Sequence, residues 1–246
     1  MSMNIEKKVE RVLIVGGNSG IGFALAERLL RDGSEVTIVG RSRDKLAVAR
    51  ARLSDAQQLH TIAADITQED HVARLFERCG PLEHIVTTAA DIEGAYQPLP
   101  SLEIAAARRV IDSKFIGPFL LAKYGAPVLS PKGSIIFTSG IAAYRPAARG
   151  SVVAAINGAL ASLAYALAVE LGPIRVNVVS PGWVDSPIWE FIAGDAKAAT
   201  LEAMAQKLLV GRIGHVDDIA DALCFLMRNS FVTGTVLHVD GGHRLV

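Results

Sequence analysis

The stretch RVLIVGGNSGIGFALAERLLRDG, residues 11–33, joins an apolar run, a glycine-rich turn and an amphipathic segment in direct succession. The run at 11–15 is short and β-branched, which predicts a buried strand, and the apolar spacing after the turn predicts a helix. Glycines between a strand and a helix allow a tight turn and a close approach to a pyrophosphate, to which the helix N-terminus donates. The stretch therefore predicts a dinucleotide site. Its residues are Gly16, Asn18, Ser19, Gly20, Ile21 and Gly22.

Similar apolar runs recur along the chain, with helical patterns between them. They lie at residues 35–39, 59–64, 84–88, 134–139, 175–180 and 235–240. Alternating strands and helices predict a parallel sheet covered on both faces, with ligands outside the carboxyl ends of the strands. We expect a seven-stranded, doubly wound α/β fold of the Rossmann type. With 246 residues, half of them hydrophobic, the chain can bury one large core, so we expect a single domain over 1–246.

Charge and cysteine content narrow the classes of partner. Basic and acidic residues number 25 each, so no net field attracts the chain to nucleic acid or to an anionic membrane, and a small-molecule partner is favoured. The two cysteines, Cys79 and Cys224, lack the spacing of metal ligands, and we expect no metal site. The charged first residues lack the apolar run of a signal peptide. Together these features predict a reduced, cytoplasmic protein.

Two apolar helical segments and one irregular segment stand out in the second half of the chain. The segment at 151–171 contains Asn157 and Glu170, and we expect it to be too short for a bilayer and to form a core or interface helix. Together with the segment at 102–124, it carries more apolar surface than one sheet face covers. Residues 183–200 interrupt the strand–helix rhythm, and they predict either a substrate lid or an ordered surface excursion.

The end of the second strand indicates which dinucleotide binds. A carboxylate is usual there in NAD sites, but this chain has Gly40, Arg41 and Ser42. A guanidinium can bind a 2′-phosphate bidentately, which favours NADP(H), although Arg41 and Arg43 can also be a solvated loop pair. Asp65 follows the third strand, where it can accept from an adenine amine or cap the helix that begins near Gln68.

These segments resemble the short-chain dehydrogenase/reductase family over essentially the whole chain. IRVNVVSPGWVDSP at 174–187 and GRIGHVDDIADALCFLMRNSFVTGTVLHVDGG at 211–242 resemble the family's last two strands and the loops beside them. The resemblance implies that Asp65 and Ile66 border the adenine. It also implies further cofactor contacts at Ala89, Pro181, Gly182, Val184 and Ser186.

The catalytic positions depart from the family pattern. The family uses a Tyr-x-x-x-Lys pair, a serine about thirteen residues earlier and an asparagine on the preceding long helix. At the matching positions this chain has Val153, Asn157, Gly140 and Lys114, so lysine and asparagine have exchanged places. The family's paired asparagines after the fourth strand are also replaced, by threonines. Valine has no ionisable proton, so the family's usual mechanism is excluded at Val153.

Other side chains can take over these roles. Asn157 can keep a hydrogen bond to the nicotinamide ribose, and Lys114 can return an ammonium to the same cleft, where desolvation lowers its pKa and makes it a possible acid. The alternatives are a buried amide satisfied by the backbone and an exposed helical lysine. Ser139 and Tyr144, which lie in or near the loop before the helix at 151–171, are further candidates to meet a substrate oxyanion.

These sequence features leave three functions open. The first is an NADP(H)-dependent oxidoreductase that acts on a small carbonyl or alcohol with an atypical site. The second is a sensor or scaffold that binds NADP(H) without turnover, and the third is a lyase or isomerase on the same fold. In the resembling family the two apolar helices pack between subunits, so we expect a homodimer or homotetramer.

Overall fold

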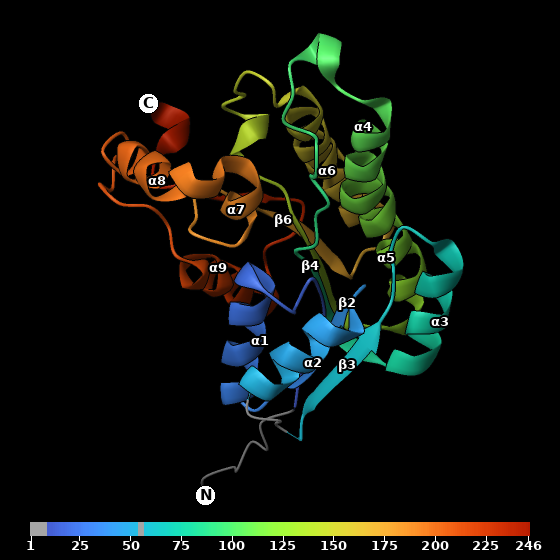
Figure 1. The fold of residues 1–246 in the computed structure, drawn as a ribbon. Helices are drawn as coiled ribbons and strands as arrows, with labels where there is room; N and C mark the ends of the chain where they lie inside the picture. The colour runs from blue at the N-terminus through green and yellow to red at the C-terminus, as the bar shows by residue number, and fades with distance from the viewer. Residues whose placement is uncertain (1–8, 54–56) are drawn as a thin grey trace, which may run out of the picture.

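A parallel sheet of seven strands forms the middle layer of the molecule, in the order β3-β2-β1-β4-β5-β6-β7 (Figure 1). This computed structural model describes residues 9–53 and 57–246. The strands are β1 (Arg11–Val15), β2 (Glu35–Gly40), β3 (Leu59–Ala63), β4 (Leu82–Thr87), β5 (Leu129–Thr138), β6 (Arg175–Pro181) and β7 (Val236–Val239). The strand order reverses between β1 and β4, which is the switch point where doubly wound sheets bind ligands. The predicted fold class is confirmed.

Helices cover both faces of this sheet. On one face lie α1 (Gly20–Arg31), α2 (Arg43–Arg52) and α9 (Val216–Arg228). On the other lie α3 (Glu69–Cys79), α4 (Ile104–Ile111), α5 (Gly117–Gly125) and α6 (Ser151–Glu170). Two further helices, α7 (Ile188–Ala193) and α8 (Lys197–Ala205), follow β6. Each face carries its own apolar core, because the strands point apolar side chains alternately toward both faces of the covered sheet.

Strand β5 begins five residues earlier than the sequence predicts. Leu129 already pairs with Leu82 of β4, and the register then shifts before His84 pairs with Ser134. The intervening Pro131 and Gly133 are poor strand formers, so the apolar pattern does not show this irregular first part.

Helix α6 is long enough to cross a bilayer, contrary to the prediction from the sequence. It has 20 residues and, by length and composition alone, is apolar enough to cross a membrane, so the expectation that it is too short is wrong. One side of it packs on β6 through core residues such as Leu160 and Ala164. The other side stays open, with Val169 86% exposed. The packed side makes α6 a core helix of this fold.

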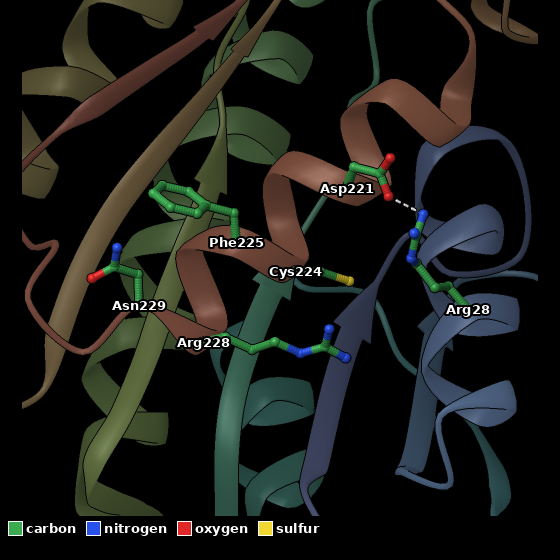
Figure 2. A pocket seen from close by; sticks show the side chains of 6 residues that line it. All are labelled: Arg28, Asp221, Cys224, Phe225, Arg228 and Asn229. Atoms are coloured by element: carbon green, nitrogen blue, oxygen red, sulfur yellow. Dashed lines mark ion pairs between the residues drawn. The ribbon is translucent and has the colours of Figure 1, made fainter.

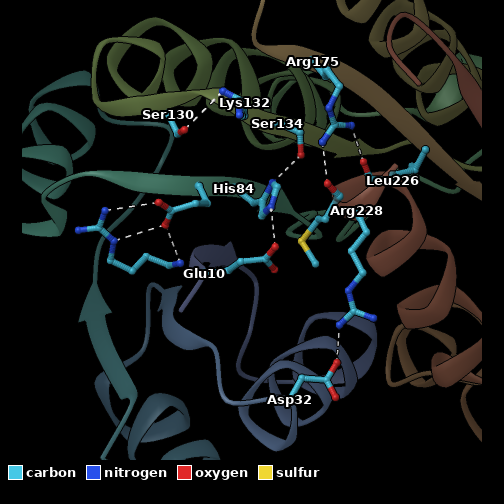
Figure 3. Close-up of polar contacts among 12 residues, drawn as sticks. Glu10, Asp32, His84, Ser130, Lys132, Ser134, Arg175, Leu226 and Arg228 are labelled. Atoms are coloured by element: carbon cyan, nitrogen blue, oxygen red, sulfur yellow. Dashed lines mark hydrogen bonds and ion pairs between the residues drawn. The ribbon is translucent and has the colours of Figure 1, made fainter. Parts of the chain in front are cut away.

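A polar network lies toward the amino ends of the middle strands (Figure 3). His84 Nδ1 lies 2.8 Å from Ser134 Oγ, and the Arg175 guanidinium donates to the carbonyl of Leu226 at 2.6 Å. Close by, Arg228 pairs with Asp32, which follows α1. This network lies at the edge of the sheet away from the glycine turn.

Candidate functional site

The turn after β1 has no room for side chains at its first and last glycines. Gly16 has φ +90°, and a Cβ there would lie 2.7 Å from the backbone nitrogen of Ala89. A Cβ on Gly22 would lie 2.4 Å from the Gly16 carbonyl oxygen. The N-cap residue of α1, Ser19, makes no side-chain capping bond, so the first N–H groups of the helix keep their capacity to bind an anion. The turn has the form that a pyrophosphate site requires.

The loop after β6 lies against this turn. A Cβ on Gly20 would lie 3.5 Å from Pro187 and 3.9 Å from the Ser186 side chain, so the fold brings together two predicted phosphate positions from opposite ends of the chain. Gly182 donates its N–H to the Val239 carbonyl at 2.9 Å. The other predicted positions of this loop, Pro181 at the end of β6 and Val184 just after it, are both buried.

The end of β2 has a glycine where the usual carboxylate would lie. A Cβ on Gly40 would lie 2.9 Å from Asn18 Oδ1, so a side chain there requires the end of the Asn18 side chain to move aside. The next residue, Arg41, pairs with Asp91 of the loop after β4, with 2.9 Å between Nη1 and Oδ2. The sequence does not reveal this role of Asp91, because Asp91 follows a different strand and only the fold brings it to Arg41. Ser42 accepts from the Lys45 N–H at 3.2 Å and caps α2.

The two predicted adenine contacts have different environments. Asp65 Oδ1 accepts from the Thr67 N–H at 3.0 Å, whereas the N-cap residue of α3 is Gln68, so the helix-capping alternative for Asp65 is wrong. The Ile66 side chain is 5% exposed and packs where a Cβ on Gly117 would lie 2.6 Å from it. Ile66 therefore has its backbone, and not its side chain, to offer a ligand.

Thr88 joins β1 and β4 at the switch point. Its N–H donates to the Val15 carbonyl at 2.8 Å, and its hydroxyl donates to the same oxygen at 3.2 Å. Thr88 therefore ties the two strands together through both its backbone and its side chain. Ala89, the next residue, closes one side of the glycine turn through its contact with Gly16.

Lys114 lies in a π-helical turn, Asp112–Ile116, that joins α4 to α5. The residue is 8% exposed, and no hydrogen bond or ion pair of its ammonium is found among the described residues. Burial lowers the pKa of Lys114 to about 8. The alternative of an exposed helical lysine is therefore wrong. Turns of this kind are frequent at functional sites, and no apolar pattern predicts them.

Asn157 is buried in α6, and its side-chain oxygen is an acceptor without a partner among the described residues. Ser139 donates its hydroxyl to the Asn157 backbone carbonyl at 2.8 Å, whereas Asn157 Oδ1 is buried and has no hydrogen-bond partner within the described ranges. A Cβ on Gly140 would lie 3.0 Å from Asn157 Nδ2, so the amide lies close against Gly140. Buried polar atoms without a partner are rare in proteins, so this oxygen is a feature that the fold alone does not explain.

Val153 lies in a small apolar cluster at the top of α6. It is 4% exposed and packs with Val110 of α4, one turn before Lys114. Ile188 and Ile192 of α7 border the cluster, as does Tyr96 from the loop after β4. Burial raises the pKa of Tyr96. This phenol escaped the sequence analysis because it belongs to a loop and matches no family position.

Tyr144 lies elsewhere, beside the edge strand β7. Its ring meets the His238 ring edge-on, with 4.5 Å between centroids, and the residue is 40% exposed. Burial also raises the pKa of Tyr144. The structure thus places Lys114, Asn157 and Ser139 on packed neighbouring elements but puts Tyr144 outside the Val153 cluster.

A groove of about 500 Å³ lies between α1 and α9 (Figure 2). It is lined by Arg28, Asp221, Cys224, Phe225, Arg228 and Asn229. Arg28 and Asp221 form an ion pair across it, and the lining belongs to the later turns of both helices, away from the glycine turn. Over residues 9–53 and 57–246, no group of three or more His, Cys, Asp or Glu side chains is arranged to hold a metal ion.

The doubly wound sheet and its glycine turn define a dinucleotide-binding protein of the Rossmann type. The sequence profile described as "Enoyl-(Acyl carrier protein) reductase" matches residues 15–244. The chain belongs to the short-chain dehydrogenase/reductase family, whose members use a nicotinamide cofactor.

Individual relatives cover nearly the full chain. The short-chain dehydrogenase/reductase malC of Malbranchea aurantiaca is 34% identical over 95% of this chain and 94% of its own length. Its structure, described as a reductase/Diels-Alderase, has a TM-score of 0.90 at 33% identity, over 97% of this chain and 98% of that one. The cis-4-hydroxycyclohexanecarboxylate dehydrogenase of Sinomonas cyclohexanicum is 34% identical, covering 98% of this chain and 99% of its own. A small-chain dehydrogenase solved in complex with NADPH has a TM-score of 0.80 at 34% identity, over 97% of this chain and 100% of that one.

Proposed function

We propose that this protein binds NADP(H) and transfers a hydride between the nicotinamide and a small carbonyl or alcohol substrate. The observation that carries the proposal is the glycine turn, where Gly16 and Gly22 leave no room for a Cβ and the α1 N-terminus lacks a side-chain cap. Arg41 supports the phosphorylated cofactor, because a guanidinium can bind a 2′-phosphate and Gly40 has no carboxylate for an unphosphorylated ribose. A similar structure holds NADPH.

The two ends of the cofactor would contact different parts of the chain. The glycine turn and Ser186 would hold the pyrophosphate, and Arg41 the 2′-phosphate. When bound, NADPH supplies the hydride, and the chain orients it. Asn157 offers its unpartnered Oδ1 to a ribose hydroxyl in the place of the family lysine. Asp65 and Ile66 line the adenine as the family resemblance implies, and Ala89 is a further cofactor contact.

Lys114 is our candidate for the proton donor. Val153 cannot donate a proton, and residue Lys114 follows Val110, the α4 residue in the Val153 cluster, by one helical turn. An ammonium in a desolvated site can stabilise a developing alkoxide and protonate it. Tyr96 is the second candidate, because it borders that cluster directly, whereas Tyr144 faces β7.

A reaction without net redox change is the second candidate function. Two observations favour it. The surroundings of Val153 are apolar and include side chains of α7, and the chain is similar to a protein described as a reductase/Diels-Alderase. Such a reaction needs a shaped apolar cavity more than it needs an acid. An NADP(H)-binding sensor would use the same glycine turn but would show no turnover.

The exposed apolar surface of α5 and α6 supports a homodimer or homotetramer. Phe119, Tyr165 and Val169 are all more than 40% exposed.

The two cysteine thiols are free, and burial raises the pKa of both, to about 11 for Cys79, so they form little reactive thiolate. Free thiols agree with a reduced, cytoplasmic setting.

The proposal is tested by following NADPH absorbance with a panel of small aldehydes, ketones and quinones, beside binding titrations with NADPH and NADH. We expect tighter binding of NADPH and its consumption with at least one carbonyl. Arg41→Ala should weaken NADPH binding and spare NADH, with Arg43→Ala at the start of α2 as the matched control. Binding without consumption would favour the sensor, and conversion of a substrate without NADPH consumption would favour the non-redox reaction. Absence of NADPH binding would overturn the proposal.

A further inference from the structure

The guanidinium that we assign to the 2′-phosphate already has an anionic partner within this chain. Arg41 Nη1 lies 2.9 Å from Asp91 Oδ2. Arg41 follows β2 and Asp91 follows β4, and β1 with its glycine turn lies between these strands in the sheet. The ion pair therefore spans the part of the carboxyl edge where the adenosine half of a dinucleotide lies in this class of fold.

Asp91 is the fixed member of the pair. Its backbone N–H donates to Ser113 Oγ at 3.0 Å, and its Oδ1 accepts from the Glu93 N–H at 3.4 Å. The Asp91 side chain is 14% exposed, whereas the Arg41 side chain is 64% exposed. The carboxylate is thus held in place by its own loop and by the turn that carries Lys114, and the long arginine side chain is the member free to move.

We propose that Asp91 competes with the cofactor's 2′-phosphate for Arg41 and thereby weakens the preference of this protein for phosphorylated nucleotides. This inference rests on the proposed function. A bound 2′-phosphate either takes Arg41 away from Asp91 or shares it, and sharing places a dianion beside a carboxylate. Both arrangements disfavour the phosphorylated ligand, whereas a ribose with a free 2′-hydroxyl needs no guanidinium and leaves the pair intact. Asp91 is therefore a specificity-determining residue that opposes Arg41.

The test is calorimetric titration with 2′,5′-ADP and 5′-AMP as probes. Asp91→Asn should bind 2′,5′-ADP about two- to fivefold more tightly than the wild type, the range that an exposed ion pair allows, and should bind 5′-AMP unchanged. The gain should shrink as salt is added. In an Arg41→Ala background the same Asp91→Asn change should have no effect, because the competition needs the guanidinium. Glu93→Gln, which removes a carboxylate from the same loop without touching Arg41, is the matched control.

Three results would overturn the inference. If Asp91→Asn weakens 2′,5′-ADP binding or leaves it unchanged, Asp91 orients Arg41 and does not compete with the ligand. If 5′-AMP gains as much affinity as 2′,5′-ADP, the pair blocks the adenosine site without selecting between ligands. If the folded wild type binds neither 2′,5′-ADP nor NADPH, the proposed cofactor itself is wrong. The first two results leave the NADP(H) assignment standing, so the two failures are distinguishable.

Discussion

At the scale of single residues, the notable feature is a pair of buried polar side chains on neighbouring elements. Lys114 and Asn157 are both buried with a polar group that lacks a partner among the residues described. We propose this donor and this acceptor as two contacts for a ligand.

Replacing Lys114 tests its role in two independent ways. With any substrate that turns over, Lys114→Met should lower kcat by about a hundredfold or more, the range of a lost general acid. The wild-type rate should fall as pH rises through about 8, because the folded pKa of Lys114 lies there and the donor must be protonated. The same substitution should raise the free energy of unfolding at pH 7 by about 3 kcal/mol. At this pH the folded wild type carries a charged ammonium that burial disfavours, whereas methionine carries no charge.

Lys123→Met, on the exposed surface of α5, is the matched control and should leave the rate unchanged. A wild-type rate that stays constant from pH 7 to pH 9, or a Lys114→Met enzyme of normal rate, would contradict the assignment. In that case Tyr96→Phe becomes the next variant to measure.

The sequence predicts the glycine turn more readily than the side chains that gather around it. Gly16 and Gly22 can be found from the sequence because the strand and the helix beside them are adjacent in the chain. Asp91 and Tyr96 cannot, because each contacts residues from distant segments that only the fold brings near. Tyr144 is a phenol close in sequence to the site, yet its ring packs on His238 across the sheet edge.

At the scale of elements, α6 is divided between two environments. Its core side, with Leu160 and Ala164, is predicted by the apolar pattern, whereas its open side is equally apolar and needs a different explanation. Pattern analysis cannot separate the two sides of a helix that is apolar all round. The same holds for the π turn at Lys114, since a local change of helix type leaves no mark on residue spacing.

The open side of α6 predicts an association between copies of the chain. Val169→Glu places a charge on that side and should shift the mass in solution toward the monomer at micromolar concentration, because burying an unpaired carboxylate at an interface is unfavourable. Light scattering measures the shift. Val48→Glu, on the exposed surface of α2, is the control and should leave the mass unchanged. A wild type that is monomeric under the same conditions would rule out this interface.

At the scale of the whole molecule, the two edges of the sheet carry different chemistry. The carboxyl edge holds the glycine turn and the buried Lys114, whereas the other edge holds buried polar groups that bond to one another (Figure 3). Among them, burial together with the nearby Arg175 lowers the pKa of His84 to about 4. The ring is therefore neutral in the folded protein at pH 7.

This histidine should make the stability of the fold sensitive to acid. The unfolded chain binds a proton at His84 near pH 6.5 and the folded chain only near pH 4, so stability is fully present above pH 6.5 and is lost as pH falls toward 4. Between pH 7 and pH 5 this group should remove about 2 kcal/mol from the free energy of unfolding, as measured with urea. His84→Gln should flatten the profile by that amount and His60→Gln should not. Parallel profiles for wild type and His84→Gln would disprove the assignment.

The Asn18 side chain over Gly40 has a consequence for anyone who wishes to redesign this protein. The usual exchange of coenzymes in such folds installs an acid at the tip of the second strand, and here the first carbon of that side chain would lie 2.9 Å from Asn18 Oδ1. The end of the asparagine side chain must turn aside to admit it. Residue 18 is therefore the first position to vary together with residue 40 in a switch to the unphosphorylated coenzyme.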